Sequence, residues 1–143
     1  MIYTDLTRRA MNIMYKAHKD QLDKSGVPYV FHPWHVAEQM TTEESCAAAL
    51  LHDVIEDTDV TAEELLEAGI SERVVEAVKL LTHRDDEPYL EYVARIKSDP
   101  IARAVKLADL AHNSDVTRFT RELTDKDRAR LEKYKKAKEI LTE

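Results

Sequence analysis

Apolar residues recur every three to four positions along most of this sequence, and strict alternation of apolar and polar residues is nearly absent. Ala47, Leu50, Leu51 and Val54 follow the i, i+3, i+4, i+7 spacing of one helix face. A second stripe with similar spacing comprises Val74, Ala77, Val78 and Leu81. The pattern predicts an all-α fold of seven or eight helices.

Capping and breaking residues set the ends of these predicted helices. Hydroxyl side chains that can accept a backbone N–H at a helix start are Thr4, Thr42, Thr61, Ser71 and Thr124. Pro88 and Pro100 suit the first turn of a helix, and Gly69 suits the end of one. Pro and Gly signals predict a loop over 21–33. The predicted helices cover about 4–20, 34–40, 43–56, 61–69, 71–81, 88–97, 101–119 and 124–142.

Length and composition narrow the class of protein. A chain of 143 residues with two glycines and no Pro/Gly/Ser-rich linker is expected to form one domain. The net charge of −7 argues against non-specific binding to nucleic acid, but it leaves room for a small phosphorylated substrate. Cys46 lies in an apolar helical context and is expected to be buried. No targeting or membrane-spanning segment is recognisable, so a cytoplasmic location without membrane attachment is the default expectation.

The run from Leu50 to Thr58 concentrates ionisable groups beside one apolar stripe. His52 and Asp53 are adjacent and can offer a nitrogen and an oxygen to the same divalent cation. Glu56 and Asp57 follow one turn later, so a helix would place them on the same side. A carboxylate there can orient a metal-bound water and take its proton. The alternative is a solvated acidic helix end, which the helix dipole disfavours.

Two further residues could complete a metal site. Asp109 lies within 104–113, which is apolar on nearly every side and therefore typical of a buried helix. A buried carboxylate needs a partner, which is either a metal or Lys106 three residues earlier. Lys106 could instead extend to water. His32 precedes Pro33, which should hold the backbone extended and aim the imidazole.

The candidate ligands supply two nitrogens and two carboxylates, and they are His32, His52, Asp53 and Asp109. Such a set suits Mn²⁺, Fe²⁺ or Zn²⁺ and leaves positions for water or substrate. His35 competes with His32 as a ligand, although we expect it to be a half-buried histidine at a helix start. Asn113 stands four residues after Asp109 and could bind a substrate or be an ordinary surface amide.

Three segments, in this order, resemble the HD superfamily of metal-dependent phosphohydrolases. They are Ala17–Pro33, Leu50–Thr58 and Lys106–Asn113. The Glu56-Asp57 pair makes the sequence similar, within that superfamily, to the (p)ppGpp hydrolase domain of the Rel/Spo enzymes and their small stand-alone relatives. The resemblance implies one HD-type helical domain over 1–143, with its motifs within 17–113 and a basic C-terminal helix at about 124–142.

The resemblance also implies roles for individual residues. The metal ligands would be His32, His52, Asp53 and Asp109, and Mn²⁺ is the usual metal. The pair that positions or activates the attacking water would be Glu56 and Asp57. The residues that contact the nucleotide would be Lys24, Ser25 and Asn113. The implied reaction is the release of pyrophosphate from the 3′ position of guanosine tetra- or pentaphosphate.

Two positions depart from the family pattern. Asp23 stands where the family usually has an arginine, and Asp115 occupies a second position that is usually basic. These charges oppose the binding of an anionic substrate. Basic residues that could compensate for them are Arg118, Arg121 and Lys126. Two alternatives therefore stay open: an HD phosphohydrolase of another nucleotide or phosphorylated cofactor, and a non-catalytic nucleotide-binding regulatory module. The last helix could pack on the core or on a second copy of the chain, as in a homo-oligomer.

Overall fold

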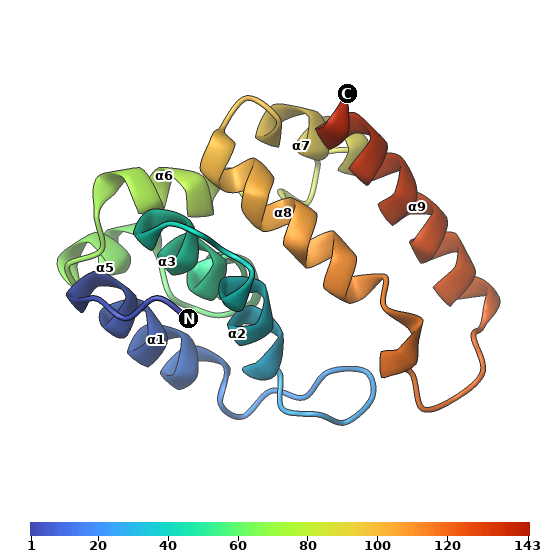
Figure 1. Ribbon diagram of the computed structural model, residues 1–143, viewed down its shortest axis with the longest axis horizontal. Helices are drawn as coiled ribbons and strands as arrows, with labels where there is room; N and C mark the ends of the chain where they lie inside the picture. Colours follow the sequence, from blue (N-terminus) through green and yellow to red (C-terminus); the bar gives the residue numbers. More distant parts are fainter.

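The computed structural model describes all 143 residues, which form nine α-helices and one short 3₁₀ helix (Figure 1). In chain order they are α1 (Asp5–His18), α2 (Phe31–Glu38), α3 (Glu43–Leu51), α4 (Val54–Asp57), α5 (Ala62–Glu67), α6 (Glu72–Leu80), α7 (Tyr89–Ile96), α8 (Pro100–Asn113), η1 (Val116–Arg118) and α9 (Asp125–Thr142). The all-α class is confirmed. None of these helices is long and apolar enough to cross a membrane.

The predicted N-caps are confirmed. The hydroxyls that accept a backbone N–H at a helix start are those of Thr4, Thr42, Thr61, Ser71 and Thr124. In four of these caps a side chain of the first turn also accepts a hydrogen bond from the backbone N–H of the cap residue. Each of these caps therefore satisfies two backbone N–H groups that would otherwise be unpaired. The caps depend on residues three positions apart, which explains why the sequence alone located these helix starts.

Tertiary structure overrides the sequence prediction at three helix boundaries. The helix predicted over 43–56 is divided, because Asp53 has φ −106° and ψ 0° between α3 and α4. This division raises the number of helices above the predicted seven or eight. The helix predicted over 101–119 ends at Asn113, and Asp115 caps η1 instead. His32 lies in the first turn of α2 rather than in extended backbone, since Pro33 needs no hydrogen-bonded N–H there.

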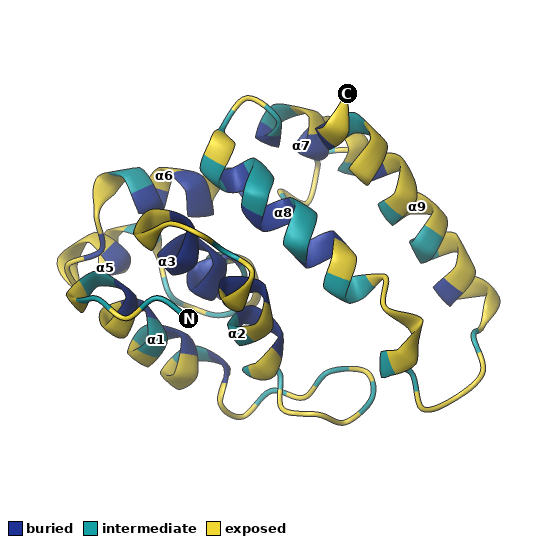
Figure 2. Cartoon of the chain, in the orientation of Figure 1, coloured by how far each residue is buried: buried dark blue, intermediate teal, exposed yellow.

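Helix α3 forms the centre of one continuous hydrophobic core (Figure 2). All of its residues from Ser45 to Leu51 are buried, and it packs against α1, α2, α6 and α8. The predicted burial of Cys46 is confirmed. Helix α9 packs on α7 and α8, and its buried residues are Asp127, Ala137 and Leu141. Most of α9 is therefore exposed, and it forms an outer wall beside α8 (Figures 1 and 2).

Candidate metal centre and substrate cleft

The fold brings the four candidate ligands close together from three helices and the break between α3 and α4. His32 comes from α2, His52 from the end of α3, Asp53 from the α3–α4 break and Asp109 from α8. The Nε2 atom of His32 lies 2.8 Å from Oδ1 of Asp109. The Nε2 atom of His52 lies 3.0 Å from Oδ2 of Asp53 and 3.5 Å from Oδ1 of Asp109. Potential ligand atoms of His32, His52 and Asp109 all lie within 4.8 Å of one another.

The orientation of His52 fits a metal ligand. Its Nδ1 lies 2.6 Å from the Ala49 carbonyl oxygen, so the ring hydrogen lies on this nitrogen when the imidazole is neutral. Its Nε2 is buried and makes no hydrogen bond of acceptable geometry, although two carboxylates lie nearby. The buried imidazole nitrogen and the neighbouring carboxylate oxygens are the ligand atoms that a divalent cation of the Mn²⁺ or Zn²⁺ type would use.

Neighbouring side chains hold the other atoms of the candidate ligands. The Tyr29 hydroxyl donates to Oδ2 of Asp53. Lys106 Nζ donates to Oδ2 of Asp109 at 3.0 Å, and Asn113 Nδ2 donates to Oδ1 of the same residue at 3.0 Å. Contacts of this kind orient metal ligands and tune their basicity. The sequence interpretation missed the role of Tyr29, although this residue lies inside one of the segments that carried the family resemblance.

The two partners considered for Asp109 are compatible with each other. Lys106 is buried and pairs with one carboxylate oxygen, while the other oxygen faces His32 and His52. The expectation that Lys106 could extend to water is wrong, because its ammonium lies 5.7 Å and 5.2 Å from the ring centroids of Tyr89 and Tyr92.

Electrostatics at the cluster favour charged groups despite their burial. Burial alone would raise the pKa of Asp109, but the Lys106 ammonium, a hydrogen bond from His32 and the nearby charge of His52 hold this pKa well below its usual range. Burial alone would lower the pKa of His52, but Asp53 and Asp109 raise it well above the usual value. A metal would therefore have to displace a proton from His52, and its affinity should increase with pH.

Replacing Lys106 by Met tests the dependence of the site on this buried charge pair. The variant keeps a side chain of similar length but leaves Asp109 without its cation, so we expect the free energy of unfolding in EDTA to fall by about 3 kcal/mol. Urea titration measures this loss. Lys97→Met is the matched control, because the exposed Lys97–Glu143 pair should contribute less than about 1 kcal/mol. An equal effect of the two substitutions would contradict the interpretation.

The predicted acidic pair lies beside the cluster. Carboxylate oxygens of Asp53, Glu56 and Asp57 come within 4.8 Å of one another. Oε1 of Glu56 accepts a hydrogen bond from the backbone N–H of His83 at 2.6 Å. Burial and the nearby charge of Asp53 raise the pKa values of both Glu56 and Asp57. Carboxylates with raised pKa values are better suited to accept a proton from water.

Two adjoining cavities form a cleft along the cluster. The inner cavity, of about 290 Å³, is lined in part by His52, Asp53, Glu56, Asp57, Lys106 and Lys133. The outer cavity, of about 350 Å³, is lined in part by Lys24, Ser25, Tyr29, Arg118 and Arg130. Asn113 and Tyr134 line both cavities. All three residues that were predicted to contact the nucleotide therefore line the outer cavity, and their role stays a prediction.

Helix α9 contributes cleft residues that the sequence interpretation did not identify. Arg130, Lys133 and Tyr134 reach the cleft from this helix. The spacing of 130, 133 and 134 places them on one helix face, which was the available signal. Arg130 and Lys133 resemble ordinary solvated charges of a basic helix, so sequence alone does not assign them to the cleft.

The two acidic departures from the family pattern have local partners. Oδ1 of Asp23 accepts from the backbone N–H groups of Ser25 and Val27 at 2.8 and 3.0 Å. Its Oδ2 lies 3.5 Å from Nη2 of Arg118. Asp115 caps η1 by accepting from the Thr117 N–H at 3.0 Å. Both carboxylates therefore act as local caps, and Asp23 also pairs with a cation that lines the outer cavity.

The other candidate residues lie elsewhere. Arg121 pairs with Asp127, and Lys126 is exposed outside both cavities. Arg118 is therefore the one of the three compensating candidates that lines the cleft. His35 is exposed rather than half-buried, and its ring stacks on His112 with centroids 4.1 Å apart.

Comparison with known proteins places this chain in a family. Residues 10–137 match the HD domain, and the chain belongs to that family. The family and the observed His/Asp cluster together imply a divalent metal.

The relatives carry names related to guanosine polyphosphates. The chain is 37% identical to the bifunctional (p)ppGpp synthase/hydrolase SpoT of Escherichia coli, with 74% of this chain and 17% of that protein covered. It is 34% identical to the guanosine-3′,5′-bis(diphosphate) 3′-pyrophosphohydrolase of Aquifex aeolicus, again with 74% and 17% covered. It is 36% identical to a GTP pyrophosphokinase of Myxococcus xanthus, with 76% and 17% covered. The chain thus spans about a sixth of the length of these relatives.

A solved structure supports the fold. A metazoan SpoT ortholog, described as hydrolysing ppGpp, superposes with a TM-score of 0.80 at 24% identity. The match covers 99% of this chain and 88% of the ortholog. The HD-type helical fold is confirmed.

Proposed function

We propose that this chain is a Mn²⁺-dependent hydrolase that releases pyrophosphate from the 3′ position of (p)ppGpp. One observation carries the proposal: the acidic pair Glu56–Asp57 lines the same cavity as three of the proposed ligands, which are His52, Asp53 and Asp109. The relatives named as 3′-pyrophosphohydrolases supply the substrate class. We further propose that residues 1–143 act as one HD unit in the cytoplasm.

The proposed ligands are His32, His52, Asp53 and Asp109. A bound divalent cation would supply Lewis-acid activation of water and of a phosphoryl oxygen. Glu56 and Asp57 would orient the attacking water and accept its proton on a carboxylate oxygen. The water oxygen bonds to phosphorus as the bond between phosphorus and the 3′ oxygen breaks, so ppGpp and water yield GDP and pyrophosphate.

Cations are available on both sides of the proposed scissile bond. Lys106 and Lys133 line the inner cavity, where the departing pyrophosphate would carry charge. Lys24, Arg118 and Arg130 line the outer cavity, where the rest of the nucleotide would extend. Burial and the neighbouring Arg130 lower the pKa of Lys24, consistent with cations gathered there in the absence of an anion.

A second candidate function rests on Asp23. Its carboxylate pairs with Arg118, so the outer cavity presents less free positive charge than its basic residues suggest. An HD phosphohydrolase of another nucleotide or phosphorylated cofactor would need less charge at this end of the cleft. The same active-site groups would then act on a different ester.

A substrate panel with Mn²⁺ tests these proposals. We expect pyrophosphate from ppGpp and pppGpp, and no orthophosphate from NADPH or nucleoside monophosphates. Pyrophosphate and orthophosphate are measured separately, and EDTA provides the blank. Orthophosphate from another nucleotide, with ppGpp intact, would favour the second candidate. Binding of ppGpp without turnover would indicate a regulatory module instead.

A further inference from the structure

The ring of His112 lies edge to edge with that of the proposed ligand His32. Their Nδ1 atoms are 2.8 Å apart and their ring planes differ by 5°. His112 comes from α8, three residues after Asp109, and contacts the nitrogen of His32 that faces away from the cluster. This arrangement connects a half-buried histidine to the buried metal centre through a single hydrogen bond.

Metal binding by His32 would fix the positions of the hydrogens on both rings. Nε2 of His32 faces Asp109 at 2.8 Å, so this nitrogen would bind the metal. An imidazole nitrogen ligates a metal only without its hydrogen, which requires the hydrogen of neutral His32 to lie on Nδ1. This N–H then donates to Nδ1 of His112, which must be the acceptor. The hydrogen of neutral His112 therefore lies on Nε2.

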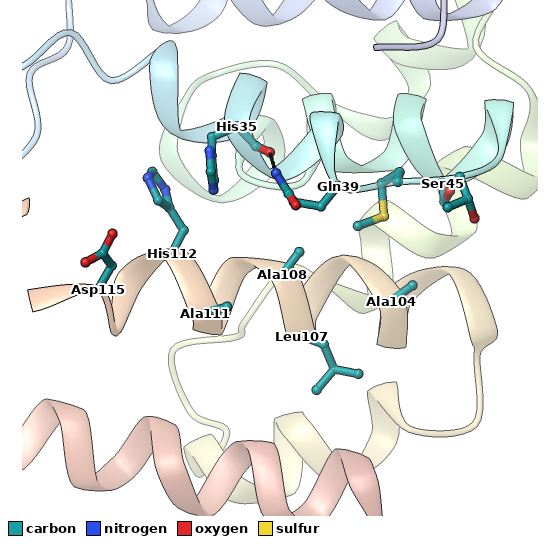
Figure 3. A pocket seen from close by; sticks show the side chains of 11 residues that line it. His35, Gln39, Ser45, Ala104, Leu107, Ala108, Ala111, His112 and Asp115 are labelled. Atoms are coloured by element: carbon teal, nitrogen blue, oxygen red, sulfur yellow. Dashed lines mark hydrogen bonds between the residues drawn. The ribbon is translucent and has the colours of Figure 1, made fainter. Parts of the chain in front are cut away.

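His112 makes two further contacts. Nη1 of Arg118 donates to the backbone carbonyl oxygen of His112 at 2.8 Å. The His35 ring stacks on the other side, inclined by 26°. Figure 3 shows both rings side by side in a groove between α2 and α8, with small alanine side chains further along the groove. The stack on His35 is thus a separate contact from the hydrogen bond between the two Nδ1 atoms.

We propose that His112 is a positioning residue that accepts the hydrogen bond from His32 Nδ1 and so fixes the tautomer and ring orientation needed for metal binding. The inference rests on the proposed ligand set. His52 has an equivalent restraint, because its Nδ1 donates to the Ala49 carbonyl. Metal-ligating histidines are commonly held by such an acceptor, and losing it typically weakens metal affinity about 10- to 100-fold.

Two substitutions at His112 distinguish the effect of its hydrogen-bond acceptor from the effect of its flat ring. His112→Phe keeps a flat ring that can stack on His35 but has no acceptor, and we expect its Mn²⁺ dissociation constant to rise about 10- to 100-fold. His112→Asn supplies an amide oxygen near the position of Nδ1, and we expect it to recover most of the affinity. His35→Leu is the matched control, because it removes the stack and leaves the hydrogen bond, so affinity should stay near that of the unmodified protein.

Calorimetric titration with Mn²⁺ measures affinity without any substrate, and the visible spectrum of the Co²⁺-loaded protein reports ligand geometry. His112→Phe should change this spectrum, and His112→Asn should restore it. Unchanged affinity and spectrum in His112→Phe would overturn the inference. If that variant unfolds in EDTA, the affinity of a folded His112→Leu variant decides in the same way. His32→Ala separates failure of this inference from failure of the proposed ligand set. If His32→Ala also binds Mn²⁺ normally, the ligand set of the proposed function is wrong.

Discussion

Replacing Asp53 by Ala should abolish both metal binding and hydrolysis. Asp53 connects the His/Asp cluster to the acidic pair. It contacts His52, and its carboxylate also lies near those of Glu56 and Asp57. Without it, the chain loses a ligand and the means to lower the pKa of the attacking water. We expect turnover to fall by more than roughly 10³-fold, because metal activation of water is the main chemical contribution of such a site.

Asp53 is a better choice for this test than Asp109. Removing Asp109 would leave Lys106 as a buried unpaired cation, so loss of activity could follow from unfolding. The Asp53 side chain is 18% exposed, and its removal leaves Lys106 paired. Metal content of the purified variant and phosphate release measure the effect. Asp59→Ala is the control, because Asp59 is exposed and lies outside both clusters. Normal metal content in Asp53→Ala would contradict the ligand assignment.

Replacing Glu56 by Gln should reduce turnover by about 10²- to 10⁴-fold, the usual contribution of general acid–base catalysis, while metal affinity stays near normal. The amide keeps an oxygen that can accept from the His83 N–H, so the local structure should persist. It cannot accept the proton of the attacking water. Hydrolysis of ppGpp and Mn²⁺ titration together measure the effect, with Glu67→Gln on the exposed surface of α5 as the control.

The pH profile gives an independent measure of the same role. Burial and nearby carboxylates raise the pKa of Glu56 above 4.5, so its base form is lost at a higher pH than for an ordinary Glu. Activity of the unmodified protein should therefore fall on the acid side, starting above that value. The residual activity of Glu56→Gln should lack this contribution. Full activity in Glu56→Gln, or the same loss in Glu67→Gln, would show that the proton is handled elsewhere, and Asp57→Asn would then be the next variant to measure.

Local sequence signals account for most of the fold but only part of the site. The caps at Thr4, Thr42, Thr61 and Thr124 depend on neighbours three residues away, and such signals are present in the sequence. The break at Asp53 was missed because the apolar stripe continues through Val54, which is buried in the same core. Periodicity reports which side chains are buried and does not report a change in helix axis.

The remaining site residues depend on contacts between distant segments. Arg118 lies opposite Asp23, 95 residues away in sequence, and Arg130 reaches the same cavity from α9. Nothing in the spacing of basic residues distinguishes Arg118 from Arg121, which pairs with Asp127 instead. When the partner of a charged residue lies in another helix, it cannot be identified from one sequence, because the distance between the two residues is set only in the folded chain.

The attachment of α9 has a consequence for how such a protein can diverge. The proposed metal ligands come from α2, the α3–α4 break and α8, all of which contribute to the central core, whereas α9 is mostly exposed. Substitutions at Arg130 and Lys133 would therefore change which ligand fits the cleft at little cost to folding. Over evolutionary time the cleft could acquire new substrates through α9 and η1 alone, while the chemistry at the cluster stays the same.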